Sequence, residues 1–131
     1  MAEIKHPKRY YYAMRNKYMR ELKQIGHKLS LATSEAEDEM YWEKYRKVLK
    51  RWRDLEIPEG VKHRSEMALQ TQKFRKPEIT EEYVALTNQL KVLYSQIKQA
   101  KGKEEFDSFE KQIQELKKRR VAITHYTDRE V

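Results

Sequence analysis

Apolar and aromatic residues recur every three or four positions along most of this 131-residue chain. In the first segment this spacing holds from Tyr11 to Leu29, which places one narrow apolar stripe on a helix. Pro7 stands just before this segment, and proline is tolerated in the first turn because its missing N–H would have no partner there. The pattern therefore predicts a first helix over residues 8–29.

A second helix has the best marked start in the chain. Ser34 and Glu37 have the spacing of a capping box, in which each side chain accepts a hydrogen bond from the other residue's backbone N–H. The acidic residues that follow suit the positive end of the helix dipole. An apolar stripe then continues until shortly before Pro58. We therefore predict a second helix over residues 34–56.

The C-terminal part of the chain has the most regular pattern. Apolar residues alternate spacings of three and four on both sides of Gly102. Thr80 is suited to cap the first of these two segments, and Gly102 is suited to end it. We predict helices over residues 80–101 and 104–122 that form a coiled-coil-like antiparallel hairpin.

These four main helices predict an all-α fold made of two antiparallel helical hairpins. We divide the chain into a basic N-terminal hairpin (1–57), a basic linker (58–79), the coiled-coil-like hairpin (80–123) and a flexible tail (124–131). The linker has weak apolar periodicity, and a short helix from Ser65 is the one regular element that we consider in it. With 3 Gly and 3 Pro, the chain lacks the turn residues that an all-β fold requires.

The packing of the two hairpins is open at this stage. Val84, Val92 and Tyr94 lie outside the heptad line, so a single seam cannot bury the apolar surface of the second hairpin. In a four-helix bundle the N-terminal hairpin would cover that surface. In an elongated molecule another chain would cover it, and a homo-oligomer through residues 80–121 is one such arrangement.

The charge of the chain favours a polyanionic partner. There are 29 basic and 21 acidic residues, a net charge of +8, and the surplus is concentrated in residues 1–32 and in the linker. Residues 44–53 hold six cations and no anion, with Arg46, Lys50 and Arg53 along one edge of the predicted helix. A competing explanation is the helix dipole, which favours an acidic start and a basic end without any ligand.

Nucleic acid is the polyanion that we consider first. The candidate phosphate contacts are cations of the first two helices and the linker: Lys8, Arg9, Arg15, Arg20, Lys23, Arg46, Lys47, Lys50, Arg51, Arg53, Lys62, Arg64, Arg75 and Lys76. Three aromatic residues beside them could stack on bases, namely Tyr10, Tyr12 and Trp42. Our first hypothesis is a small non-enzymatic protein that binds DNA or RNA mainly through phosphates.

A protein partner is the alternative hypothesis. The chain would then be a virion or ribonucleoprotein subunit, a small viral accessory protein, or an adaptor or inhibitor that docks on an acidic surface of a larger complex. The thin core and the regular heptad seam favour this alternative. Opposite charges that alternate over the surface would support it, whereas one continuous positive field would support nucleic acid.

The sequence contains no catalytic, cofactor or metal motif. It has no cysteine, its four histidines are scattered, and its three glycines stand apart from one another. We therefore expect no enzyme activity, no cofactor and no metal ion. No apolar run is long enough for a membrane span or a signal peptide. Because the absence of cysteine suits a reducing compartment, we expect a cytoplasmic location without a membrane partner.

Overall fold

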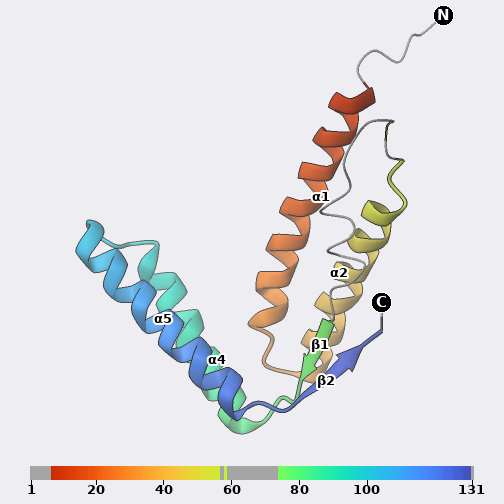
Figure 1. Ribbon diagram of the computed structural model, residues 1–131. Helices are drawn as coiled ribbons and strands as arrows, with labels where there is room; N and C mark the ends of the chain where they lie inside the picture. Colours follow the sequence, from red (N-terminus) through yellow and green to blue (C-terminus); the bar gives the residue numbers. More distant parts are fainter. Residues whose placement is uncertain (1–6, 57, 59–73, 131) are drawn as a thin grey trace, which may run out of the picture.

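The computed structural model describes residues 7–56, 58 and 74–130 of the chain. Four helices lie within these residues: α1 (Pro7–Ser30), α2 (Glu35–Arg53), α4 (Glu81–Ile97) and α5 (Lys103–Ile123). Helix α1 packs against α2, and α4 packs against α5, so the two predicted antiparallel hairpins are confirmed (Figure 1). Most of the predicted linker, including the helix considered from Ser65, lies outside the described residues.

Both predicted N-caps are confirmed. The Ser34 hydroxyl oxygen accepts a hydrogen bond from the backbone N–H of Glu37 at 3.1 Å. The Thr80 hydroxyl oxygen accepts the equivalent bond from the backbone N–H of Tyr83 at 3.2 Å. Each cap satisfies a backbone donor that a helix start leaves without an internal partner, and so it sets the residue at which the helix begins.

Helices α2 and α4 end earlier than predicted, at Arg53 and Ile97 instead of residues 56 and 101. After α2, the backbone N–H of Leu55 bonds the carbonyl oxygen three residues before it at 3.1 Å. After α4, the N–H of Ala100 makes the same kind of bond at 3.2 Å. Such bonds tighten the last turn and satisfy its carbonyl groups, and apolar spacing alone does not reveal them.

The two hairpins have separate cores. In the first, Leu22 of α1 packs with Leu49 and Trp52 of α2, and all three residues are buried. In the second, Leu90 of α4 packs with Ile113 of α5, and both are buried. Each core is the apolar stripe of one helix set against the stripe of its neighbour, as the spacing predicts.

A two-stranded antiparallel sheet joins segments far apart in the chain. Strand β1 (Phe74–Pro77) pairs with β2 (Tyr126–Arg129), with Phe74 opposite Arg129 and Pro77 opposite Tyr126. The segment predicted as a flexible tail, residues 124–131, thus contains β2, and residues 74–77 of the predicted linker form β1. Neither four-residue segment has enough apolar residues to show a strand period. Each segment also pairs with residues about fifty positions away along the chain, so no local pattern reveals the pairing.

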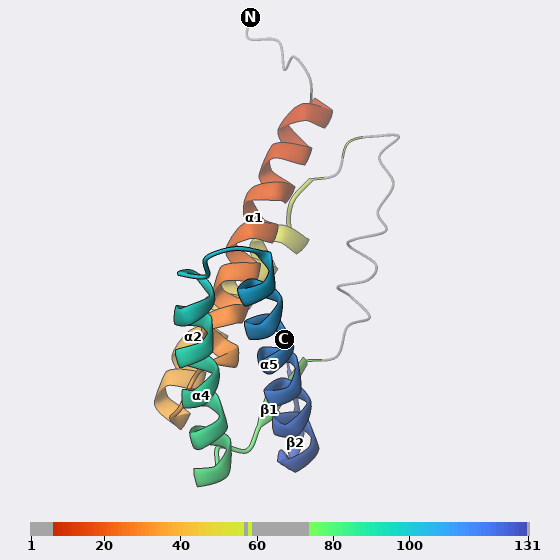
Figure 2. The same cartoon turned by 90° about the vertical axis from the view of Figure 1, so that its left-hand side faces the viewer.

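The hairpins diverge from a common base and do not form a four-helix bundle (Figures 1 and 2). At the base, the Arg120 guanidinium donates hydrogen bonds to the Ser30 carbonyl oxygen at 2.7 Å and to the Thr87 hydroxyl at 3.0 Å. The guanidinium also lies over the Tyr83 ring, 5.0 Å from its centre. Arg120 of α5 thus ties the end of α1 to α4, while the two hairpins extend away from each other (Figure 1).

Candidate nucleic-acid interface

The acidic start of α2 lies at the base of the molecule, where cations of the sheet neutralise it. The ammonium group of Lys76 is 2.7 Å from a carboxylate oxygen of Glu35 and 3.1 Å from one of Glu39. These two hydrogen-bonded carboxylates raise the pKa of Lys76 above its ordinary value. Lys76, a predicted phosphate contact, is therefore occupied by partners within the chain.

A further carboxylate of this end, Asp38, is fully buried and forms an ion pair with Arg129 of β2. The side chain of Arg129 is 5 % exposed, and its guanidinium lies 4.8 Å from the centre of the Trp42 ring. A buried carboxylate requires such a partner, because its desolvation would otherwise cost several kcal/mol. Sequence analysis missed Arg129, since an arginine in a predicted tail has no local signal of burial.

The structure corrects the prediction that Trp42 could stack on a base. Its ring is buried, stacks on Tyr45 at 5.8 Å between ring centres, and meets Phe74 of β1 at 5.5 Å. Trp42 lies at the edge of the apolar stripe of α2. The helix pattern alone does not show whether another segment of the chain covers such an edge position. Here the sheet covers it, so this aromatic group belongs to the core.

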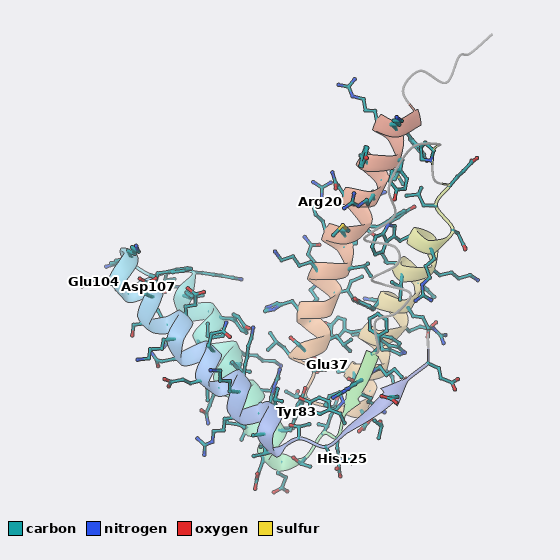
Figure 3. All side chains as sticks on the ribbon, viewed as in Figure 1. Arg20, Glu37, Tyr83, Glu104, Asp107 and His125 are labelled. Atoms are coloured by element: carbon teal, nitrogen blue, oxygen red, sulfur yellow. The ribbon has the colours of Figure 1, made fainter. Side chains whose placement is uncertain are left out.

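The opposite end of the first hairpin collects cations. Because the helices are antiparallel, the N-terminal half of α1 lies beside the C-terminal half of α2 (Figure 1). The exposed predicted contacts on these two helices are Lys8, Arg9, Arg20, Lys23, Arg46, Lys47, Lys50 and Arg51. Figure 3 shows Arg20 on the side of α1 away from α2. We call this region, residues 8–23 of α1 with residues 44–53 of α2, the basic end.

One hollow of the basic end, with a volume of about 510 Å³, follows the outer face of α2. It is lined by Glu43, Arg46, Lys47, Lys50, Arg53 and Asp54. Arg46 is paired with Glu43 at 2.9 Å, and Arg53 is half-buried. Lys47 and Lys50 are exposed and have no ion-pair partner among the described residues. These two lysines are therefore the cations of this face best placed to meet a phosphate.

A second hollow, of about 580 Å³, lies between the two helices of the basic end. It is lined by Tyr10, Tyr18, Arg51, Asp54, Leu55, Glu56 and Pro58. Tyr10 is 63 % exposed, so this predicted stacking residue is accessible and lies in the same hollow as Arg51. Tyr12 is also exposed, but its ring meets Tyr11 edge-on and lies under the Arg15 guanidinium, which is half-buried.

Arg75, like Lys76, is not part of the basic end. Arg75 is exposed in β1, and its carbonyl oxygen accepts a hydrogen bond from Arg129 at 3.3 Å. Lys62 and Arg64 lie outside the described residues. The structure thus brings the predicted residues of α1 and α2 together and keeps those of β1 at the base.

The described residues contain no cluster of three His, Asp or Glu side chains that could hold a metal ion. In the same part of the chain, each helix is too short or too polar to cross a bilayer. Comparisons with protein-family models, with curated proteins and with solved structures find no match to this chain.

Proposed function

We propose that this protein is a non-enzymatic nucleic-acid-binding protein that contacts phosphates through the basic end of its N-terminal hairpin. The observation that carries the proposal is the charge at the start of α1. Helix α1 has no acidic residue in its first turn, and Lys8 and Arg9 are both exposed there. The helix dipole disfavours cations at this position, so it does not account for them.

The charges of α2 add to this support. The dipole accounts for Lys50, Arg51 and Arg53 in the last turn of α2. The dipole does not account for Lys47, which lies one turn before the last turn of α2. It also does not explain why these cations lie beside the cationic start of α1. Meanwhile Lys76 and Arg129 bind three of the acidic residues at the far end of the hairpin, Glu35, Asp38 and Glu39. Within the described residues the hairpin therefore carries most of its uncompensated positive charge at one end, which favours phosphate binding there.

The proposed binding mode does not select a particular nucleotide sequence, because its contacts are mainly to phosphates. Lys47, Lys50 and Arg51 reach phosphates on exposed helix faces, and burial of Trp42 removes one of the three aromatic groups that could read or stack a base. The exposed ring of Tyr10 offers a stacking surface for a single unpaired base. We therefore expect single strands to bind at least as tightly as duplexes.

Fluorescence anisotropy with labelled DNA and RNA, measured at several salt concentrations, tests this proposal. The triple variant Lys47→Gln, Lys50→Gln, Arg51→Gln should bind more weakly and should reduce the slope of log affinity against log salt by about 2 to 3, since each phosphate contact contributes about 0.7 to 0.9. A matched control, Lys98→Gln, Lys101→Gln, Lys103→Gln, removes three exposed cations from the tip of the second hairpin and should keep the wild-type slope.

Two results would overturn the proposal. One is no binding of either nucleic acid at low salt, which would favour an acidic protein surface as the partner. The other is an equal loss of affinity in the two triple variants, because the positive charge would then act without regard to its place.

A further inference from the structure

The second hairpin has a groove between α4 and α5 on its free flank. It has a volume of about 520 Å³ and is lined by Gln89, Val92, Leu93, Gln112, Glu115, Leu116 and Arg119. Val92 is 55 % exposed at its rim, whereas Leu93 beside it belongs to the buried core. The groove therefore opens onto the apolar seam of the hairpin, and this seam has no cover on that side among the described residues.

The two flanks of this hairpin differ in charge. On the other flank Tyr94 meets His27 of α1 at 4.7 Å between ring centres, and Lys98 and Lys117 are close enough to lower the pKa of that histidine. On the groove flank α4 contributes only the uncharged residues Gln89, Val92 and Leu93. Loss of charge at the centre of a patch is the compositional mark of a protein interface.

Helix α5 contributes the only two charges in the groove lining, and they have opposite signs. Glu115 and Arg119 are one helical turn apart, and both are exposed. Neither has an ion-pair partner within the described part of the chain. A two-fold axis perpendicular to α5 and midway between them would run two copies of α5 antiparallel. Glu115 of each copy would then lie opposite Arg119 of the other, so the surface is complementary to itself.

We propose that this groove is the interface of a homodimer, in which the groove of a second copy of this chain packs against it. The dimer is an antiparallel four-helix arrangement built from two second hairpins. Val92 and Leu116 supply its apolar centre, and two symmetry-related pairs between Glu115 and Arg119 set its register. Both basic ends stay outside this interface, because they belong to the first hairpin (Figure 1).

The oligomeric state of the full chain without nucleic acid, measured by sedimentation over a concentration series, tests the proposal. We expect a monomer–dimer equilibrium in the wild-type protein. Glu115→Arg places like charges opposite each other twice in the dimer, so it should raise the dimer dissociation constant at least about tenfold. The double variant Glu115→Arg, Arg119→Glu exchanges the two signs and should restore dimerisation.

Glu110→Arg is the matched control, because Glu110 is exposed on the same helix but outside the groove lining, and the change in net charge is the same. Circular dichroism of each variant establishes that the helices are intact. A wild-type chain that stays monomeric at every concentration would overturn the proposal, as would a dimer that Glu115→Arg leaves unchanged or that the exchanged pair does not restore. These results do not depend on nucleic-acid binding, so this proposal and the proposed function can fail separately.

Discussion

The two hairpins are built from the same kind of helix pair, and they differ in what covers them. The sheet covers the first hairpin, where Phe74 packs on Trp42 and Tyr45. The second hairpin receives Leu31 from the link between α1 and α2, and its other flank leaves Val92 exposed. Because two helices bury only one stripe against each other, each pair needs a third surface. The first finds it within the chain, and we propose that the second finds it in another copy.

The hairpins also differ in charge. Residues 1–57 carry fourteen basic and nine acidic residues, whereas residues 80–123 carry nine basic and seven acidic residues. At the tip of the second hairpin, Glu104 and Asp107 stand among lysines of the same turn (Figure 3). One hairpin therefore has a positive end that suits a polyanion, and the other has a mixed surface that suits a protein. The two functional hypotheses thus apply to different parts of one molecule.

The largest effect on this comparison is expected from Leu90→Asp. Leu90 is fully buried in the seam between α4 and α5, so the variant places a charge without a partner in that core. We expect the free energy of unfolding to fall by more than about 4 kcal/mol. Unchanged thermal unfolding would show that the seam is not the core of the second hairpin.

The tryptophans make the Leu90→Asp variant more informative. Both tryptophans of the chain, Trp42 and Trp52, lie in α2, so their fluorescence reports only on the first hairpin. The two hairpins have separate cores. In thermal unfolding of the Leu90→Asp variant, we therefore expect helicity to fall at a lower temperature than the temperature at which the tryptophan emission changes. A simultaneous change in both signals would mean that the two hairpins fold as one unit.

Removal of the buried ion pair at the base should have the second largest effect. Arg129→Met leaves the Asp38 carboxylate buried without its ion-pair partner, which we expect to cost about 3 kcal/mol of stability. Urea unfolding followed by tryptophan fluorescence measures this loss of stability, because Trp42 and Trp52 are buried in the folded first hairpin. The double variant Asp38→Leu, Arg129→Met should recover much of the loss, since neither charge is then buried. Arg20→Met is the control on an exposed arginine.

The helices could be predicted from the sequence, whereas the burial of Trp42 under the sheet could not. Periodicity and caps located four helices and their pairing, because these depend on residues three or four positions apart. The sheet and the partners of Arg129 and Lys76 depend on residues far apart in the chain. A list of cations therefore predicted the basic end but could not separate Lys47, which is exposed, from Lys76, which is bound within the chain.

The smallest effect concerns the contact between the hairpins at His27, and it depends on pH. Burial against Tyr94 and the nearby Lys117 and Lys98 lower the pKa of His27 below its ordinary value of 6.5. The unfolded chain therefore binds a proton more readily than the folded one, so stability is full above pH 6.5 and falls as the pH drops toward the lower folded pKa. Thermal unfolding of the wild-type protein should show this small loss.

His27→Gln removes the titrating group and should make this part of the pH dependence disappear. Lys98→Gln keeps the histidine and removes one repelling charge, so it should reduce the dependence without abolishing it, because burial is the larger cause. An equally steep loss of stability in His27→Gln would assign the pH dependence to other groups. His27 would then be a contact between the hairpins that does not respond to pH, and Tyr94 would pack against it in the same way on both sides of pH 6.5.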